Sequence, residues 1–201
     1  TGERRLGQLL DRIGRDTYRA SCLNIFEQSR ALDRAAIAAL ADGTWSREGY
    51  LDNDGQSDDP VKVRLKLTIE GENMLIDLEG SSPPVAGSIN CGAVQTQSLL
   101  RLAYKTMISP DRAITGGSFS TMSVNIPDDC MFNAREPYAC TWYFTGLGLL
   151  ADLMIACLSE AMPEQATAAH YGDSMVASFF GIDPRKKQWL SVEATAGGWG
   201  G

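Results

Sequence analysis

Residues 61 to 69 alternate without interruption between apolar and polar side chains, and this run constrains the fold more than any other. The apolar positions are Val61, Val63, Leu65, Leu67 and Ile69, and the polar positions between them are Lys62, Arg64, Lys66 and Thr68. A period of two puts the two sets on opposite faces of a β-strand. The turn at 70–73 and the apolar run at 74–78 then predict an antiparallel hairpin. The chain must therefore build a sheet with one covered and one solvated face.

Helical periodicity precedes this hairpin. Apolar residues recur at helical spacing between Leu6 and Ile13, which predicts a first helix. Asp16 is placed to cap a second, longer helix that runs to about Ala41. A short strand at about residues 44–51 is then expected to lead into the sheet.

The rest of the chain mixes the two periods. Helices are expected at 93–107 and 145–162, and strands at 119–126, 176–182 and 189–194. Helices and strands therefore occur in an order that does not repeat a strand–helix unit.

A Ser- and Pro-rich loop, SSPPVAG at residues 81–87, is the candidate boundary inside the chain. Residues 1–80 form a helix plus β-hairpin segment, and residues 81–201 form a mixed α/β segment. The predicted fold class is α+β, with N-terminal helices, an antiparallel β-hairpin sheet and then the mixed segment. Because the chain begins at Thr1 without a methionine and ends in a glycine run, we expect one continuous piece of a larger polypeptide.

Composition restricts the partners. Hydrophobic residues make up 44% and charged residues 21% of the chain, and the formal net charge is −7, which is typical of a soluble globular protein. An acidic surface repels phosphate backbones and anionic lipids, so we expect no nucleic acid and no membrane as partner. The longest apolar stretch, 143–158, carries Asp152 and is too short to span a bilayer. No secretory signal is recognisable at the N-terminus.

Cysteine usage points to a reducing compartment. The five cysteines are odd in number and widely spaced, and no CxxC occurs. This pattern favours reduced thiols in a cytoplasmic protein over a disulfide framework or a thiolate zinc site.

Residues usual in acid–base and metal chemistry are few. His170 is the single histidine, and it is either a catalytic group near Asp173 and Ser174 or a turn or interface residue. The segment 52–59 has the composition of a calcium loop, but its glycine comes early and Val63 occupies the closing position. Turn chemistry is therefore favoured over a hard-metal site. We name no catalytic residue and no metal ligand.

Three glycine-rich loops, at 80–92, 115–119 and 196–201, are either structural turns or loops that line a ligand site, and none is a phosphate-binding P-loop. The candidates for substrate binding lie in or beside them: Asn90, Gly116, Gly117, Glu193, Gly197 and Gly198. Asn90 can hold a main-chain segment or a substrate amide through its paired donor and acceptor. The glycines permit close backbone approach, and Glu193 is a polar contact beside the last loop.

Six short segments occur in an informative order. They are AIAALADGT at 36–44, YLDNDG at 50–55, DLEGSSP at 77–83 with GSIN at 87–90, SPD at 109–111 with GSF at 117–119, NAREP at 133–137, and EATAGGWG at 193–200. In this order they resemble the hydantoinase B/oxoprolinase family. The resemblance is strongest at 77–90.

The resemblance implies a subunit that works in a hetero-oligomer with a hydantoinase A-type subunit, which binds ATP. Such a pair opens cyclic amides such as hydantoin, 5-oxoproline or a lactam, and ATP turns a poorly electrophilic amide oxygen into a leaving group. Related complexes carboxylate ketones with ATP, which is one alternative. A non-catalytic scaffold or interaction domain is another. The family's divalent-metal motifs would lie N-terminal to the matched segment, so this chain would bind no cofactor itself.

Two segments depart from the family pattern. TWYFTG at 141–146 and HYGD at 170–173 replace runs that are usually GNVETS and SQGT. These changes indicate either a larger, apolar or aromatic substrate or a non-catalytic divergent copy.

Overall fold

The computed structural model describes residues 1–169 and 175–195. Within them the fold is α+β, as predicted, with four α-helices and two separate sheets. The elements are α1 (Gly2–Ile13), α2 (Arg15–Ala38), β1 (Gly43–Leu51), β2 (Val61–Glu70), β3 (Asn73–Asp77), α3 (Ala93–Ile108), β4 (Met122–Asn125), the 3₁₀ turn η1 (Met131–Asn133), α4 (Tyr143–Ala161), the 3₁₀ turn η2 (Pro163–Gln165), β5 (Met175–Ile182) and β6 (Gln188–Thr195).

The larger sheet has the strand order β1-β2-β3-β4. β2 pairs antiparallel with β1 and with β3, which confirms the hairpin read from the alternating run. β4 pairs parallel with β3, from Met74↔Met122 to Asp77↔Asn125, so the sheet is mixed. The chain reaches β4 through α3, because parallel neighbours need a long crossover. This pairing joins segment 1–80 to segment 81–201 in one sheet.

The apolar face of the sheet carries the core. Val63, Leu65 and Leu67 of β2 are fully buried, whereas the Lys and Arg residues between them are partly exposed on the opposite face. α4 packs against β1 and β2, and α3 packs against α4. Burial of these surfaces is the main driving force for this layer arrangement.

α4 runs to Ala161 and is longer than the apolar stretch at 143–158 read from the sequence, so the expectation that it is too short to span a bilayer was wrong: it is the one described helix that is long and apolar enough to cross a membrane by length and composition. In this fold it is the helix next to the sheet, and Leu150, Met154 and Leu158 on it are buried in the core. A core helix passes the same test, so its apolar composition is explained by packing.

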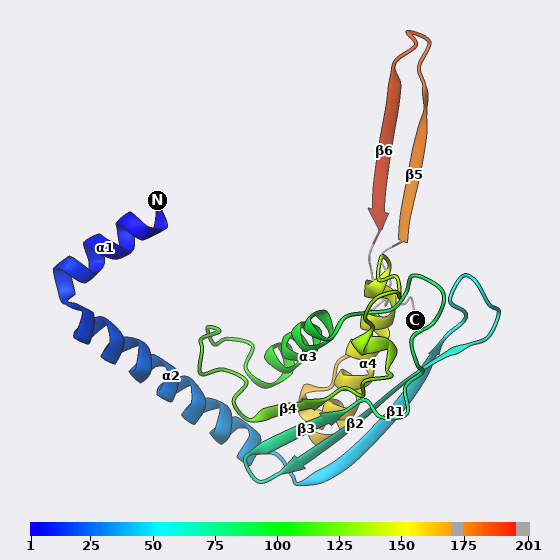
Figure 1. Ribbon diagram of the computed structural model, residues 1–201. Helices are drawn as coiled ribbons and strands as arrows, with labels where there is room; N and C mark the ends of the chain where they lie inside the picture. Colours follow the sequence, from blue (N-terminus) through cyan, green and yellow to red (C-terminus); the bar gives the residue numbers. More distant parts are fainter. Residues whose placement is uncertain (170–174, 196–201) are drawn as a thin grey trace.

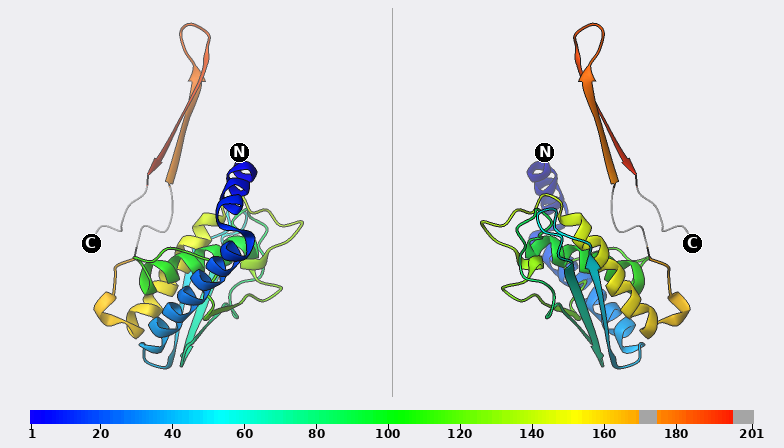
Figure 2. Two further views of the ribbon diagram at one scale, coloured as in Figure 1. Left: turned by 90° about the vertical axis from the view of Figure 1, so that its left-hand side faces the viewer. Right: turned by 90° about the vertical axis from the view of Figure 1, so that its right-hand side faces the viewer.

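Two elements extend away from the body (Figures 1 and 2). α1 and the first half of α2 form an arm, and α1 contains no buried residue. The β5–β6 hairpin projects from the opposite end of the molecule. The bend between α1 and α2 lies at Gly14, whose φ of 80° suits glycine. Asp16 therefore lies in the first turn of α2 and is not its cap, contrary to the sequence expectation.

The edge strand β4 is shorter than expected. The sequence predicted a strand from Phe119, but β4 begins at Met122. Phe119 has a φ of 65°, which is incompatible with an extended strand. Its main-chain N–H is instead bound by a side chain of α2, which fixes the preceding loop against that helix.

Candidate functional site

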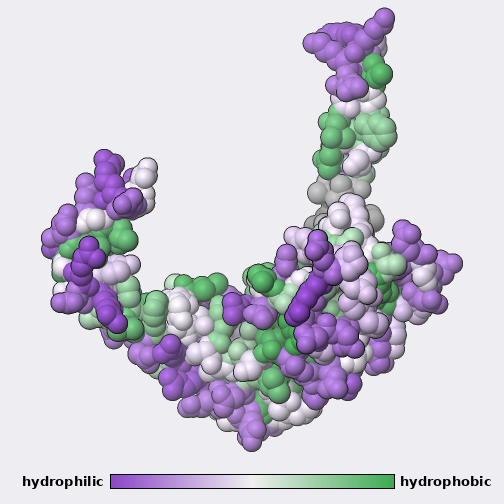
Figure 3. Space-filling model, in the orientation of Figure 1, coloured by the Kyte–Doolittle hydropathy of each residue, from purple (hydrophilic) through white to green (hydrophobic). Residues whose placement is uncertain are grey.

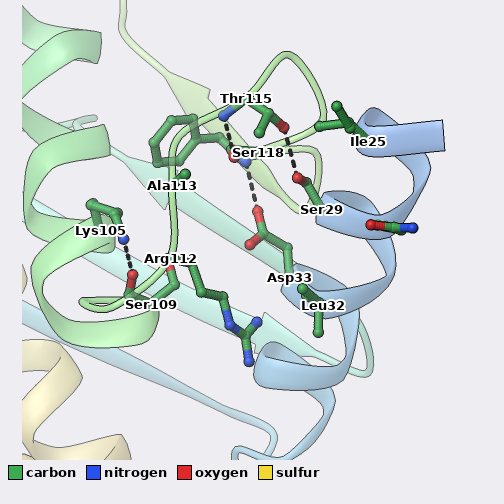
Figure 4. Close-up of a pocket in the computed structure, with 12 residues that line it drawn as sticks. Ile25, Ser29, Leu32, Asp33, Lys105, Ser109, Arg112, Ala113, Thr115 and Ser118 are labelled. Carbon is green, nitrogen blue, oxygen red and sulfur yellow. Dashed lines mark hydrogen bonds between the residues drawn. The ribbon is translucent and has the colours of Figure 1, made fainter. Parts of the chain in front are cut away.

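A pocket of about 240 Å³ lies between α2, the end of α3 and the loop 109–119 (Figure 4). Its walls are mostly apolar, and Asp33 and Ser29 on α2 and Thr115 on the loop supply polar groups. Apolar walls with a few convergent polar groups are typical of small-molecule sites. Thr115, Ser118 and Phe119 of the glycine-rich loop at 115–119 line the pocket, whereas Gly116 and Gly117 of that loop do not.

Asp33 connects the two walls of this pocket. It lies on α2, is only 4% exposed, and accepts a 2.7 Å hydrogen bond from the main-chain N–H of Phe119. A buried carboxylate is expensive unless it is hydrogen-bonded, and this contact provides one partner. Ser29, one helical turn earlier, lies 2.7 Å from the hydroxyl of Thr115. The polar stripe of α2 therefore fixes the position of the loop.

Gly116 and Gly117 allow the loop to lie directly on α2. A Cβ added at Gly117 would lie 2.0 Å from the carbonyl oxygen of Phe26, and one added at Gly116 would lie 2.9 Å from the Phe26 ring. Both distances are shorter than van der Waals contact allows. The close backbone approach expected of these glycines is thus an approach to α2. Contact of either glycine with a substrate stays a prediction.

Two cations belong to the other wall of the pocket. Lys105 on α3 donates hydrogen bonds to the main-chain carbonyls of Ser109 and Pro110, and so holds the start of the loop. Arg112 is an exposed residue of the same loop and lines the pocket. The Asp33 acceptor on α2 and the Arg112 donors on the loop are suited to a small polar molecule that carries both an N–H and a carbonyl or carboxylate group.

Asn90 lies in a different part of the fold and is fully buried. Its side-chain oxygen accepts the N–H of Val85, and its nitrogen donates to the carbonyls of Val85, Gly87 and Ala139 at 2.9, 2.9 and 3.0 Å. Asn90 therefore holds main chain, one of the two roles expected of it. A role in binding substrate stays a prediction.

The remaining candidates lie far along the chain. Glu193 is an exposed residue of β6, and its carboxylate accepts a hydrogen bond from the hydroxyl of Ser191. Gly197 and Gly198 lie outside the described residues, as does His170. The structure thus places the loop at 115–119, Asn90 and Glu193 in three different regions of the fold.

No thiol in the core is poised as a nucleophile. Burial raises the pKa of Cys91 and of Cys157 to about 11 each, and burial also raises the pKa of Cys130. Because the thiolate is the reactive form, these three side chains act as small apolar residues of the core.

One known protein family matches the whole chain. The family model for hydantoinase B/oxoprolinase matches residues 1–201. The chain belongs to the hydantoinase B/oxoprolinase family. This confirms the resemblance read from the six sequence segments.

Curated relatives agree with this assignment. The chain is 26% identical over 211 residues to a putative D-/L-hydantoinase B-type subunit from Pseudomonas sp. (strain NS671), covering 100% of this chain and 35% of the relative. It is 29% identical over 188 residues to the beta subunit of caprolactamase from Pseudomonas jessenii, covering 92% and 32%. Both names designate subunits, so these relatives belong to multi-subunit assemblies.

Solved structures share the architecture. The crystal structure of ATP-dependent caprolactamase from Pseudomonas jessenii matches 94% of this chain and 33% of that chain, with a TM-score of 0.83 and 27% identity. A nucleotide-free structure of acetone carboxylase, an enzyme of ATP-dependent acetone carboxylation, matches 93% and 27%, with a TM-score of 0.80 and 16% identity. The second likeness shows the fold alone. The chain spans about a third of the length of the curated relatives it matches.

Family membership raises the question of a metal ion. Within residues 1–169 and 175–195, no group of three or more His, Cys, Asp or Glu side chains lies close enough together to hold one.

Asp33 was not among the site residues predicted from the sequence, although its spacing along α2 indicates that it needs a hydrogen-bond partner. Ser29, Asp33 and Ile37 follow each other at intervals of four along α2, and Ile37 is fully buried. An acidic residue on the buried stripe of a helix needs a hydrogen-bond partner. The spacing therefore predicts that Asp33 accepts a hydrogen bond, but it does not predict which segment of the chain donates it.

Proposed function

We propose that this chain is an internal part of a hydantoinase B-type subunit in an ATP-dependent enzyme that opens a cyclic amide. The observation that carries the proposal is the likeness to ATP-dependent caprolactamase, at 27% identity and a TM-score of 0.83 over 94% of the chain. Hydantoins, 5-oxoproline and lactams are the candidate substrates, because each contains an unreactive ring amide.

The proposed assembly is a cytoplasmic hetero-oligomer. A hydantoinase A-type subunit would bind ATP, which supplies the phosphoryl group that activates an amide oxygen. In this proposal, the described residues of this chain supply the four-stranded sheet and the loops that lie beside α2 and α3. Support comes from the two curated relatives, which are both named as subunits.

The pocket beside α2 is the part of this chain that we propose for contact with a small polar ligand. Its size of about 240 Å³ accommodates a small ring. Asp33 offers a carboxylate acceptor to a ring N–H, and Arg112 offers donors to a carbonyl oxygen. Gly116 and Gly117 would act indirectly, because they allow the loop to lie directly against α2. Asn90, Glu193, Gly197 and Gly198 remain proposed contacts elsewhere in the complete subunit.

Ketone carboxylation is the second candidate, and the fold shared with acetone carboxylase favours it. That likeness rests on 16% identity, compared with 27% for caprolactamase. The hydrolase is therefore the preferred function.

The test is substrate-triggered ATP hydrolysis by the complete subunit, purified together with its ATP-binding partner. Phosphate release is measured with hydantoin, 5-oxoproline and caprolactam, and ring opening is followed by mass spectrometry. We expect at least one ring to raise phosphate release, with one ring opened for each phosphate and no need for bicarbonate. Stimulation by a ketone only in the presence of bicarbonate would establish the carboxylase instead. Assembly that requires this segment while no ring or ketone stimulates ATP hydrolysis would establish a scaffold.

A further inference from the structure

The β5–β6 hairpin exposes an apolar face in the described structure. Phe180 faces Leu190 across the two strands, and Ser178 faces Val192. On that face Phe180 is 80% exposed, Ile182 69% and Leu190 67%. Figure 3 shows an apolar shaft that ends in a polar tip. Exposed apolar clusters of this kind mark interaction surfaces.

The opposite face of the hairpin is also partly apolar. Trp189 lies over Gly181, where an added Cβ would be 3.1 Å from the indole nitrogen, and Phe179 faces Ser191. Both aromatic side chains are about half exposed. A hairpin with large apolar residues on both faces has the pattern of a layer covered on two sides, and not of a one-sided docking patch.

The distribution of charged residues along the hairpin indicates that its two strands are permanently covered. β5 contains no charged residue, and Glu193 is the single charged residue of β6. The other charges of the hairpin lie in the turn: Asp183, Arg185, Lys186 and Lys187. Proteins protect strands that stay at an edge with charged side chains, especially Lys, or with Pro, and of these the two strands carry Glu193 alone. A two-stranded hairpin is also marginally stable by itself in water.

The length of a related subunit indicates what covers the exposed apolar faces of the hairpin. Two parts of the described chain stand away from the body: the arm formed by α1 and the first half of α2, and the β5–β6 hairpin (Figure 1). The matched caprolactamase chain is about three times as long, since the likeness covers 94% of this chain and 33% of that one. Segments that are neighbours in sequence are usually neighbours in space. A subunit of that length has polypeptide outside this chain that is available to cover the hairpin.

We propose that, in the complete subunit, polypeptide of the same subunit from outside this chain covers the Phe180–Leu190 face of the hairpin. The hairpin is then an internal layer of the subunit and not the docking site of the ATP-binding partner or of a second copy. This inference rests on the proposal that the chain is part of a larger hydantoinase B-type subunit, but it does not depend on which substrate the enzyme takes.

The test is hydrogen exchange, followed by mass spectrometry, on the complete subunit purified without its partner and again in the complex. We expect peptides from 176–182 and 188–195 to be protected in the subunit alone, to the same degree at low and high concentration, with no further protection in the complex. The tip at 183–187 should exchange quickly in every sample. Protection that arises only with the partner, or only at high concentration, would overturn the proposal.

A pair of variants checks the same point independently. Leu190→Asp places a charge in the covered face, and Lys187→Asp places one at the tip. We expect Leu190→Asp to abolish soluble complete subunit, or to expose the hairpin to exchange, already without the partner, whereas Lys187→Asp changes neither. A Leu190→Asp subunit that is soluble, keeps its exchange pattern and fails only to bind the partner would contradict internal burial. Failure of the ATP hydrolysis assay would leave these outcomes unaffected.

Discussion

Asp33 on α2 accepts a hydrogen bond from the main-chain N–H of Phe119, at 2.7 Å and across 86 residues of sequence. This contact fixes the loop before β4 to the helix that leaves the body as an arm. Phe119 also has a φ of 65°, so the chain is not yet in strand geometry where it meets the helix. Together with the contact between Ser29 and Thr115, the hydrogen bond to Asp33 joins two walls of the pocket beside α2.

Replacing Asp33 should loosen the loop in a way that depends on the acceptor. Asp33→Ala leaves the Phe119 N–H without its acceptor and should lower the free energy of local opening at 113–121 by about 1–3 kcal/mol. Asp33→Asn should lower it less, because the amide oxygen can still accept. Native-state hydrogen exchange of the complete subunit measures both. Asp11→Ala, on the exposed arm, serves as the control, and equal exchange in all three variants would refute the anchoring role.

Gly117 should tolerate a methyl group less well than Gly116. The added Cβ of Gly117→Ala meets the Phe26 main chain, which cannot move without α2, whereas that of Gly116→Ala meets a ring that can turn. Overpacking of this kind costs about 1–3 kcal/mol. Thermal unfolding of the complete subunit should show a clearly larger loss of Tm for Gly117→Ala. Reduced turnover with unchanged Tm and loop exchange would point instead to direct contact with substrate.

The sheet was predictable because its signal is local. The alternation at 61–69 fixes which face of β2 is buried, and a shift by one residue would expose the whole apolar set. The parallel addition of β4 was not predictable, because the partner of a strand after a long crossover depends on the packing of α3. The departure of Phe119 from strand geometry was not predictable either, and neither was the contact of its N–H with Asp33 of α2.

The candidate site was only partly predictable for the same reason. Glycine at 116 and 117 indicates that something approaches closely, but it does not say whether that is a ligand or a helix. The Phe26 main chain decides this in favour of the helix. Asp33 lies four residues before Ile37, so both are on one face of α2 and Asp33 could be expected to need a hydrogen-bond partner. Only the tertiary structure shows that this partner is the Phe119 N–H.

Asn90 should be among the least replaceable residues of the chain. Asn90→Ala removes four hydrogen bonds to buried or part-buried main chain. Leaving several buried groups unpaired should cost about 3 kcal/mol or more. We expect a large fall in soluble yield and in the urea midpoint of the complete subunit. The exposed Asn73→Ala is the matched control, and an Asn90→Ala protein of normal stability but altered KM would favour substrate contact.

Asp54 should make the loop at 52–57 sensitive to acid. Its carboxylate accepts the N–H of Gly87 at 2.8 Å and those of Gln56 and Ser57 at 2.8 and 2.7 Å. The Gly87 N–H, followed by the other two, holds the pKa of Asp54 below its ordinary value. A carboxyl with a depressed folded-state pKa stabilises the protein above its unfolded pKa, and this stability is lost as the pH falls through the folded value.

The pH dependence of one variant isolates this contribution. At neutral pH, Asp54→Asn should increase amide exchange at Gly87 and at residues 52–57, because the amide accepts fewer and weaker hydrogen bonds. As the pH falls from about 5 towards and below the ordinary Asp pKa of about 3.9, the difference from the wild type should shrink. Intrinsic exchange rates are corrected at each pH, and Asp52→Asn, an exposed neighbour, should match the wild type throughout. A difference that stays constant down to pH values at which the wild-type carboxyl is protonated would show that the Asp54 charge does not hold the two loops together.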